Sequence, residues 1–219
     1  MCGIFGFTDF KKDDLDKARK SLHTLHHRGP DQWNDYFDKK IYIGHQRLSI
    51  LDLSLLGKQP MVSEDENVII TVNGEVYNFK VLKKELENKY EFKSTSDSEV
   101  VLYGYVEWGI DGLLERIDGM YALCIYDKQK DELFLVRDRV GIKPLYYGLI
   151  NNQISWASEL KAIQKLYEEE KVLTIDYTAL YDFLTYRFIP TPKSLYNNIY
   201  KLEPGHYLKV NTKNNTFKK

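Results

Sequence analysis

The 219-residue sequence has little of what marks several large classes of protein. Its two cysteines are too few for the disulfide framework of a secreted domain. It has 31 basic and 32 acidic residues, without the basic excess usual in nucleic-acid-binding proteins. No apolar run is long enough to cross a bilayer, and charges at Lys11-Lys12 come too early for a signal peptide. We therefore expect a cytoplasmic protein without a nucleic-acid or membrane partner.

The composition is that of a folded domain. Hydrophobic residues make up 43% of the chain and aromatic residues 14%, which is enough to bury a core. The length fits one large domain, or one domain and part of a second.

Four segments carry a helical pattern. Apolar residues recur at three- and four-residue spacing from Leu15 to Leu25, which predicts an amphipathic helix with Asp13 or Asp14 as its cap. Helices are predicted at 15–25, at 79–86, from Ser96-Asp97 onwards and around 180–184. The proline-rich residues 189–192 should break the last one.

Strand-like segments are more numerous than helices. They are predicted at 2–7, 41–43, 48–51, 68–72, 120–126, 133–137, 145–149 and 154–157. Asn73-Gly74, between two apolar runs, predicts a tight hairpin turn, and Ser158 is the expected cap of a short helix. Because strands and helices do not alternate strictly, we expect an α+β fold with mostly antiparallel sheets.

Cys2 is the candidate nucleophile. Removal of Met1 would leave Cys2 with a free α-amine a few bonds from its own sulfur. An α-amine has an ordinary pKa of about 8, so it can serve as a base near neutral pH. Nucleophile and base would then come from one residue, as in enzymes with an N-terminal threonine. A chance Met-Cys start is the simpler alternative.

The residues around Cys2 oppose that alternative. Cys2-Gly3-Ile4-Phe5-Gly6 resembles the opening of class II glutamine amidotransferases, which are N-terminal nucleophile hydrolases. Similar blocks follow in the family's order at 27–31 (HRGPD), 44–50 (GHQRLSI), 59–61 (QPM), 73–78 (NGEVYN), 96–99 (SDSE), 137–147 (RDRVGIKPLYY) and 157–162 (ASELKA). The last two resemble the glutaminase domain of asparagine synthetases in particular. The ordered set covers nearly the whole chain.

The resemblance implies hydrolysis of the glutamine side-chain amide to glutamate and ammonia through a Cys2 thioester. It assigns the oxyanion donors to the Asn73 side-chain amide and the Gly74 backbone N–H. A plain Asn-Gly turn is compatible with that role, because a tight turn would hold both donors rigidly.

The resemblance also implies how free glutamine is held. Arg47 is the position for its α-carboxylate, which a guanidinium can bind with two hydrogen bonds. Asp97 is the position for its α-ammonium, although a helix N-cap is the simpler role for an aspartate there. Glu75 is expected to contact the amine or the amide. Leu48, Ile50 and Leu51 are expected to line the pocket, partly through their backbone groups.

Several other reactive residues are given structural roles. Cys124 lies in an apolar run and is expected to be a buried thiol. His26 and His27 are adjacent, so they would not share a helix face as metal ligands. Arg137-Asp138-Arg139 is expected to form an ion-pair network or a domain contact. No metal or organic cofactor is expected in this domain.

The implied fold is a four-layer αββα sandwich of two antiparallel sheets. We expect a glutaminase domain over 1–175, and over 176–219 a linker and the start of a synthetase domain. ATP and Mg²⁺ belong to that synthetase domain, whose Ser-Gly-Gly-x-Asp-Ser loop does not occur here. The synthetase, which would make asparagine from aspartate, can follow in cis or be a separate subunit, and a homodimer is also compatible.

Two alternatives stay open from the residues alone. The ammonia could go to another acceptor, such as a sugar acid, with the chain serving another synthase. A catalytically silent docking domain is the second alternative.

Overall fold

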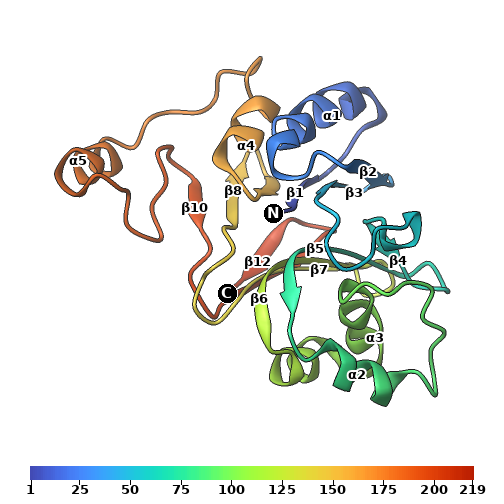
Figure 1. Ribbon diagram of the computed structural model, residues 1–219. Helices are drawn as coiled ribbons and strands as arrows, with labels where there is room; N and C mark the ends of the chain where they lie inside the picture. The colour runs from blue at the N-terminus through green and yellow to red at the C-terminus, as the bar shows by residue number, and fades with distance from the viewer.

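The computed structural model describes residues 1–219 as two six-stranded antiparallel sheets with helices outside both (Figure 1). One sheet contains β1 (Gly3–Thr8), β2 (Gln32–Phe37), β3 (Ile41–Arg47), β8 (Tyr146–Ile150), β9 (Gln153–Ala157) and β10 (Ile199–Lys201), in the order β10-β8-β9-β1-β3-β2. The other contains β4 (Met61–Val62), β5 (Val68–Val76), β6 (Gly119–Asp127), β7 (Glu132–Arg137), β11 (Tyr207–Asn211) and β12 (Thr216–Lys218), in the order β12-β11-β7-β6-β5-β4.

Helices cover the outer face of each sheet (Figure 1). The helices are α1 (Leu15–His23), α2 (Phe79–Leu86), α3 (Ser98–Arg116), α4 (Leu160–Leu166) and α5 (Tyr177–Tyr186), with short 3-10 turns at Lys12–Asp14, His26–Arg28 and Leu55–Gly57. The pair α1 and α4 packs on the sheet of β1, whereas α2 and α3 pack together, with α3 on β5 of the other sheet. The predicted α+β class and the four-layer αββα sandwich are confirmed.

The alternation of side chains along the strands builds three cores. In β1, Ile4 faces the space between the sheets, while Phe5 lies under α1 and α4. In β6, Cys124 joins the inter-sheet core, while Leu123 packs in the core beneath α2 and α3. Each sheet is therefore apolar on both faces, as a four-layer sandwich requires.

Strands of the two sheets meet across the inter-sheet core. Both β1 and β3 contact β5. The fully buried His45 of β3 spans the layers, and its Nε2–H donates to the Val72 carbonyl of β5 at 3.1 Å. This arrangement brings the start of β1, which follows Cys2, next to the part of β5 that contains Asn73.

The predicted hairpin at Asn73-Gly74 is wrong. β5 runs without a break through both residues and pairs with β6, Asn73 opposite Ala122 and Gly74 opposite Tyr121. Glycine allows the backbones of β5 and β6 to approach closely here, because a Cβ on Gly74 would overlap the carbonyl of Met120. Asn-Gly is thus part of a strand and not of a turn.

Three other local predictions are also wrong. Residues 48–51 form a loop after β3 instead of a strand. The Asp14 carboxylate caps no helix N–H and instead accepts the backbone N–H of Lys11. Ser158 does not cap α4, because its hydroxyl accepts the N–H of Ile4.

The helices at 79–86, from 97 onwards and around 180–184 are confirmed as α2, α3 and α5. α5 ends where Arg187 adopts a left-handed conformation, just before the proline-rich segment. Beyond it, β10 and β11 extend one sheet each. The division at residue 175 stays a prediction. No helix in the fold has both the length and the apolar character needed to cross a bilayer.

Candidate active site

A cavity of about 230 Å³ lies where the residue before β1, the loop after β3, the middle of β5 and the start of α3 meet. Its walls contain every residue predicted from the sequence: Cys2, Arg47, Leu48, Ile50, Leu51, Asn73, Gly74, Glu75 and Asp97. Residues up to 95 positions apart in sequence are thus brought together around one thiol. Their individual roles stay predictions.

The Cys2 thiol is half-buried and contacts the backbone of Leu48. The Leu48 N–H donates to Sγ at 3.5 Å, and the thiol faces the Leu48 carbonyl at 3.7 Å. Burial raises the pKa of the Cys2 thiol above its ordinary value, although the N-terminal ammonium and Arg47 lower it. The thiol is therefore protonated near neutral pH and needs a base to become a nucleophile.

Met1 occupies the position next to that thiol. It lines the cavity, and its peptide bond contains the Cys2 nitrogen. A peptide nitrogen is not a base, so the amine mechanism requires that Met1 be removed.

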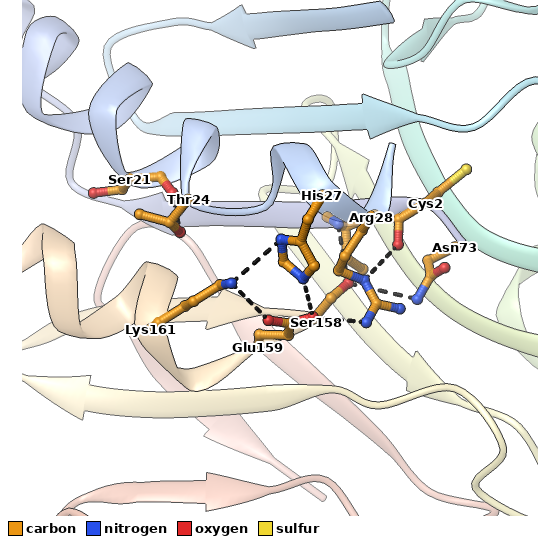
Figure 2. Close-up of polar contacts among 10 residues, drawn as sticks. Cys2, Ser21, Thr24, His27, Arg28, Asn73, Ser158, Glu159 and Lys161 are labelled. Atoms are coloured by element: carbon orange, nitrogen blue, oxygen red, sulfur yellow. Dashed lines mark hydrogen bonds and ion pairs between the residues drawn. The ribbon is translucent and has the colours of Figure 1, made fainter. Parts of the chain in front are cut away.

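Arg28 holds the main chain at Cys2. Its Nε donates to the Cys2 carbonyl at 2.9 Å, and its Nη1 donates to Glu159 at 2.9 Å. His27 and Lys161 also contact the Glu159 carboxylate, as Figure 2 shows. Burial would raise the pKa of Glu159, but hydrogen bonds from Arg28, His27 and Lys161 lower it to about 2. The carboxylate stays ionised and keeps Arg28 in place.

Asn73 is buried on β5 beside Cys2. Its Nδ2 lies 3.5 Å from the hydroxyl of Ser158, and its Oδ1 is buried without a partner. Gly74 follows it in the same cavity wall. The two predicted oxyanion donors are therefore carried by strand β5, which at these residues pairs only with β6.

Arg47, at the end of β3, both lines the cavity and anchors the loop that follows. Its guanidinium donates to the carbonyls of Asp52 and Ser54 and, at 3.3 Å, to the side chain of Gln32. These bonds leave its Nε–H and one Nη2–H without a protein partner. The loop packs so closely that a Cβ on Gly57 would overlap the Arg47 guanidinium.

Asp97 stands at the N-cap position of α3, yet its carboxylate caps no helix N–H. Oδ2 instead accepts the N–H of Val76 at 2.7 Å, which ties α3 to β5. Burial raises the pKa of Asp97, and the nearby Glu75 carboxylate adds to the increase. With Arg47 lining the same cavity, both signs of charge that a free amino acid requires are present there.

Sequence reasoning missed part of the cavity wall. The missed residues are Asp52, Gly57, Gln59, Val72, Ser96, Ser98, Met120 and Lys143. Asp52 accepts hydrogen bonds from Ser54 and Thr95, and its pKa falls to about 2, with the Ser54 hydroxyl as the largest cause. Four of the missed residues, Gln59, Ser96, Ser98 and Lys143, lie in the resemblance blocks, which were the available signal.

Of the two roles expected for Arg137-Asp138-Arg139, the ion-pair network is wrong, because these side chains bond to backbone groups, and the domain contact stays a prediction. Arg137 donates to the carbonyls of Gly141, Lys143 and Leu202, and Asp138 accepts three N–H groups of the following loop. The segment thereby fixes the loop that carries Lys143 to the cavity. Cys124 is fully buried, and burial raises the pKa of its thiol well above the ordinary value.

Comparison with known proteins agrees with this geometry. Residues 1–219 match the glutamine amidotransferase domain family. The chain belongs to that family. This glutamine amidotransferase domain is 35% identical over 98% of its length to asparagine synthetase [glutamine-hydrolyzing] 2 of Bacillus subtilis, and covers 30% of that relative. It is 38% identical over 93% of its length to a putative asparagine synthetase [glutamine-hydrolyzing] 2 of Methanocaldococcus jannaschii, and covers 42% of it.

The glutamine amidotransferase domain also resembles a solved structure. It superposes on glutamine phosphoribosylpyrophosphate amidotransferase from B. subtilis with a TM-score of 0.72 at 22% identity, over 100% of this chain and 49% of the other. At that identity the likeness concerns the fold alone. The chain spans less than half the length of each of these relatives.

Proposed function

We propose that this domain hydrolyses the side-chain amide of L-glutamine and passes the ammonia to a synthetase. The observation that carries the proposal is the position of the Cys2 thiol in a cavity with Asn73 and Gly74 beside it. Arg47 and Asp97 on the walls of the same cavity suit the two charges of the substrate.

The reaction begins with proton transfer from the Cys2 thiol to its own α-amine. Sulfur then bonds to the amide carbon, and the electron pair of the carbonyl bond moves to oxygen, where Asn73 and Gly74 donate hydrogen bonds. The oxyanion collapses, the carbon–nitrogen bond breaks, and the α-ammonium returns its proton to the departing nitrogen. Ammonia and a glutamyl thioester are formed.

Water completes the cycle. The amine takes a proton from water as its oxygen bonds to the thioester carbon, and the same donors stabilise the second oxyanion. The carbon–sulfur bond breaks, the thiolate regains its proton, and glutamate leaves. No residue of this chain is assigned to ATP or Mg²⁺.

Asparagine formation from aspartate is the proposed destination of the ammonia, because the relatives named above are asparagine synthetases. The same proposal includes delivery of the ammonia to a synthetase in cis or to a separate subunit. It also includes segment 176–219 as the link to the synthetase, and a homodimer. A catalytically silent docking role is disfavoured, because one cavity contains the whole predicted set of Cys2, Arg47, Asn73, Gly74 and Asp97.

The test is release of glutamate and ammonia from glutamine by the 219-residue chain. Cys2→Ala should abolish it, whereas Cys124→Ala is the matched control because Cys124 is buried away from the cavity. Undiminished glutamine hydrolysis by Cys2→Ala would contradict the proposal.

A further inference from the structure

The Asn73 amide has its polar atoms the wrong way round for an oxyanion donor. Its side chain is buried, its NH₂ group contacts Ser158 at 3.5 Å, and its carbonyl oxygen has no partner (Figure 2). A buried carbonyl oxygen without a donor is unfavourable. The Nδ2 donor of the amide therefore contacts Ser158, and the Oδ1 acceptor is left without a hydrogen bond.

Ser158 has a proton to give. Its fully buried Oγ accepts the N–H of Ile4 at 3.0 Å and the contact from Asn73, but donates to no protein acceptor. A hydroxyl can donate once and accept twice. Two donors, the amide NH₂ and the hydroxyl, thus meet in one contact while the amide oxygen stays unpaired.

A half-turn of the amide about its Cβ–Cγ bond resolves both problems. Oδ1 then faces Ser158 and accepts its hydroxyl proton, while Oγ keeps the N–H of Ile4. The same half-turn moves Nδ2 to the side that Oδ1 now occupies, away from Ser158. Because Asn73 lines the cavity with Cys2, the amide hydrogens become available to an oxygen of the reacting substrate.

We propose that Ser158 is a positioning residue that orients the Asn73 amide, with its hydroxyl donating to Oδ1 and Nδ2 directed to the oxyanion. The inference rests on the proposed glutaminase function. Ser158 should therefore affect the stabilisation of the tetrahedral intermediate and not the binding of glutamine.

A purely structural role for Ser158 makes a different prediction. The residue also ties β1 to the start of α4, since its N–H donates to the Ile4 carbonyl and its Oγ accepts the Ile4 N–H. Loss of that tie would disturb Cys2 itself, two residues away. Readouts that separate the nucleophile from the oxyanion donor therefore decide between the two roles.

The first experiment compares Ser158→Ala with wild type in glutamine hydrolysis. We expect kcat to fall on the order of 10²-fold, as for loss of one oxyanion donor, with KM changed by less than about threefold. Alkylation of Cys2 by iodoacetamide forms no oxyanion, so its rate should stay within about twofold of wild type. Ser155→Ala is the matched control, because Ser155 is equally buried on β9 but bonds to neither Ile4 nor Asn73.

The second experiment tests whether Ser158 acts through Asn73. Ser158→Ala should cost little further kcat when added to Asn73→Ala. Glutamate γ-semialdehyde, whose aldehyde carbon bonds to the Cys2 sulfur and leaves a tetrahedral oxygen, should bind on the order of 10²-fold more weakly to Ser158→Ala. If the alanine variant does not fold, Ser158→Cys takes its place: its thiol is a weaker donor than the hydroxyl, so its kcat should be below that of wild type while KM and the rate of Cys2 alkylation change little.

Three results would overturn the inference: unchanged kcat in Ser158→Ala, a full additional loss in the Asn73→Ala background, or a drop in Cys2 alkylation that matches the drop in kcat. Wild-type protein that alkylates at Cys2 but releases no glutamate would instead overturn the proposed function.

Discussion

The two walls of the cavity are built differently. The wall that carries Cys2 and Asn73, the residues predicted to take part in the chemical step, consists of regular strands, with Asn73 buried on β5 and Cys2 leading into β1. The wall that follows β3 is a loop. Its residues Leu48, Ile50 and Leu51 line the cavity, whereas Leu53 and Leu55 do not and are 80% and 77% exposed. Strands can fix the atoms that react, whereas a loop can admit and release the substrate.

The loop wall is nevertheless anchored at two points. Arg47 holds the Asp52 and Ser54 carbonyls from within, and the Asp52 carboxylate reaches the backbone and hydroxyl of Thr95. Changes in the strand wall should therefore appear mainly in the chemical step. Changes in the loop wall should appear mainly in the use of glutamine.

The largest effect should come from retention of Met1. A retained Met1 turns the proposed base into a peptide nitrogen and occupies part of the cavity. Protein with intact Met1 should be inactive, and intact mass should show its loss in active preparations. Full turnover by a preparation that keeps Met1 would rule out the amine as the base.

On the strand wall, Asn73→Ala should lower kcat by about 10²–10³-fold with little change in KM. Because Asn73 lies within β5 and not in a turn, alanine should be tolerated there and the melting temperature should change little. Asn73→Asp loses the donor and places a carboxylate near the oxyanion, so it should be at least as damaging. Near-normal kcat in Asn73→Asp, with the substitution verified by mass, would remove Asn73 from the chemical step.

On the loop wall, Arg47→Ala should lower kcat/KM for glutamine. The fall should correspond to a loss of about 2–4 kcal/mol in transition-state stabilisation. Part of that loss would come from release of the Asp52 and Ser54 carbonyls, so a second substrate is needed. The α-amide of glutamine lacks the α-carboxylate, and wild type should strongly prefer glutamine over it. Arg47→Ala should lose this preference, and Arg47→Lys should lose part of it. A variant that still prefers glutamine as strongly would show that another group binds the carboxylate.

The smallest effect concerns the link between the two sheets. His45 is fully buried, and desolvation lowers its pKa from 6.5 to about 4, although its bond to the Val72 carbonyl opposes the shift. Because the pKa of His45 is lower in the folded chain than in the unfolded chain, the unfolded chain binds a proton first as the pH falls. The contribution of neutral His45 to the free energy of unfolding is therefore complete above pH 6.5 and is lost progressively as the pH falls towards 4. At pH 5.5 the loss should be about 1.4 kcal/mol.

Urea unfolding at pH 7.5 and 5.5 checks this expectation. The matched variant His45→Gln keeps a donor for Val72 but cannot ionise, so the difference between the two pH values should shrink. An equal difference in wild type and variant would assign the pH dependence to other groups.

Local sequence patterns predicted the helices well because apolar spacing reports directly on the buried face of a helix. They missed β2, whose sequence QWNDYF is largely polar, because it is an edge strand with one neighbour. The Asn-Gly pair misled because a glycine suits a tight turn and a close strand contact equally well.

The candidate site was predictable through the resemblance, but its supporting bonds were not. Ser158 bonds to Ile4, 154 residues away, and Arg28 to Glu159, 131 residues away. From the sequence alone, Ser158 is explained as a helix cap, and Arg28 and Glu159 as surface charges. Only the packing of the two sheets reveals which backbone and which side chain they hold.

Rapid quenching during turnover, followed by peptide mass spectrometry, shows whether the Cys2 sulfur attacks glutamine. We expect a glutamyl group attached to the peptide that begins at Cys2, with no Met1 and no label on Cys124. The adduct should be released by hydroxylamine, as a thioester is, and should be absent from Cys2→Ala. A glutamyl group on any other residue, or steady release of glutamate with Cys2 unmodified at every quench time, would show that the Cys2 sulfur is not the nucleophile.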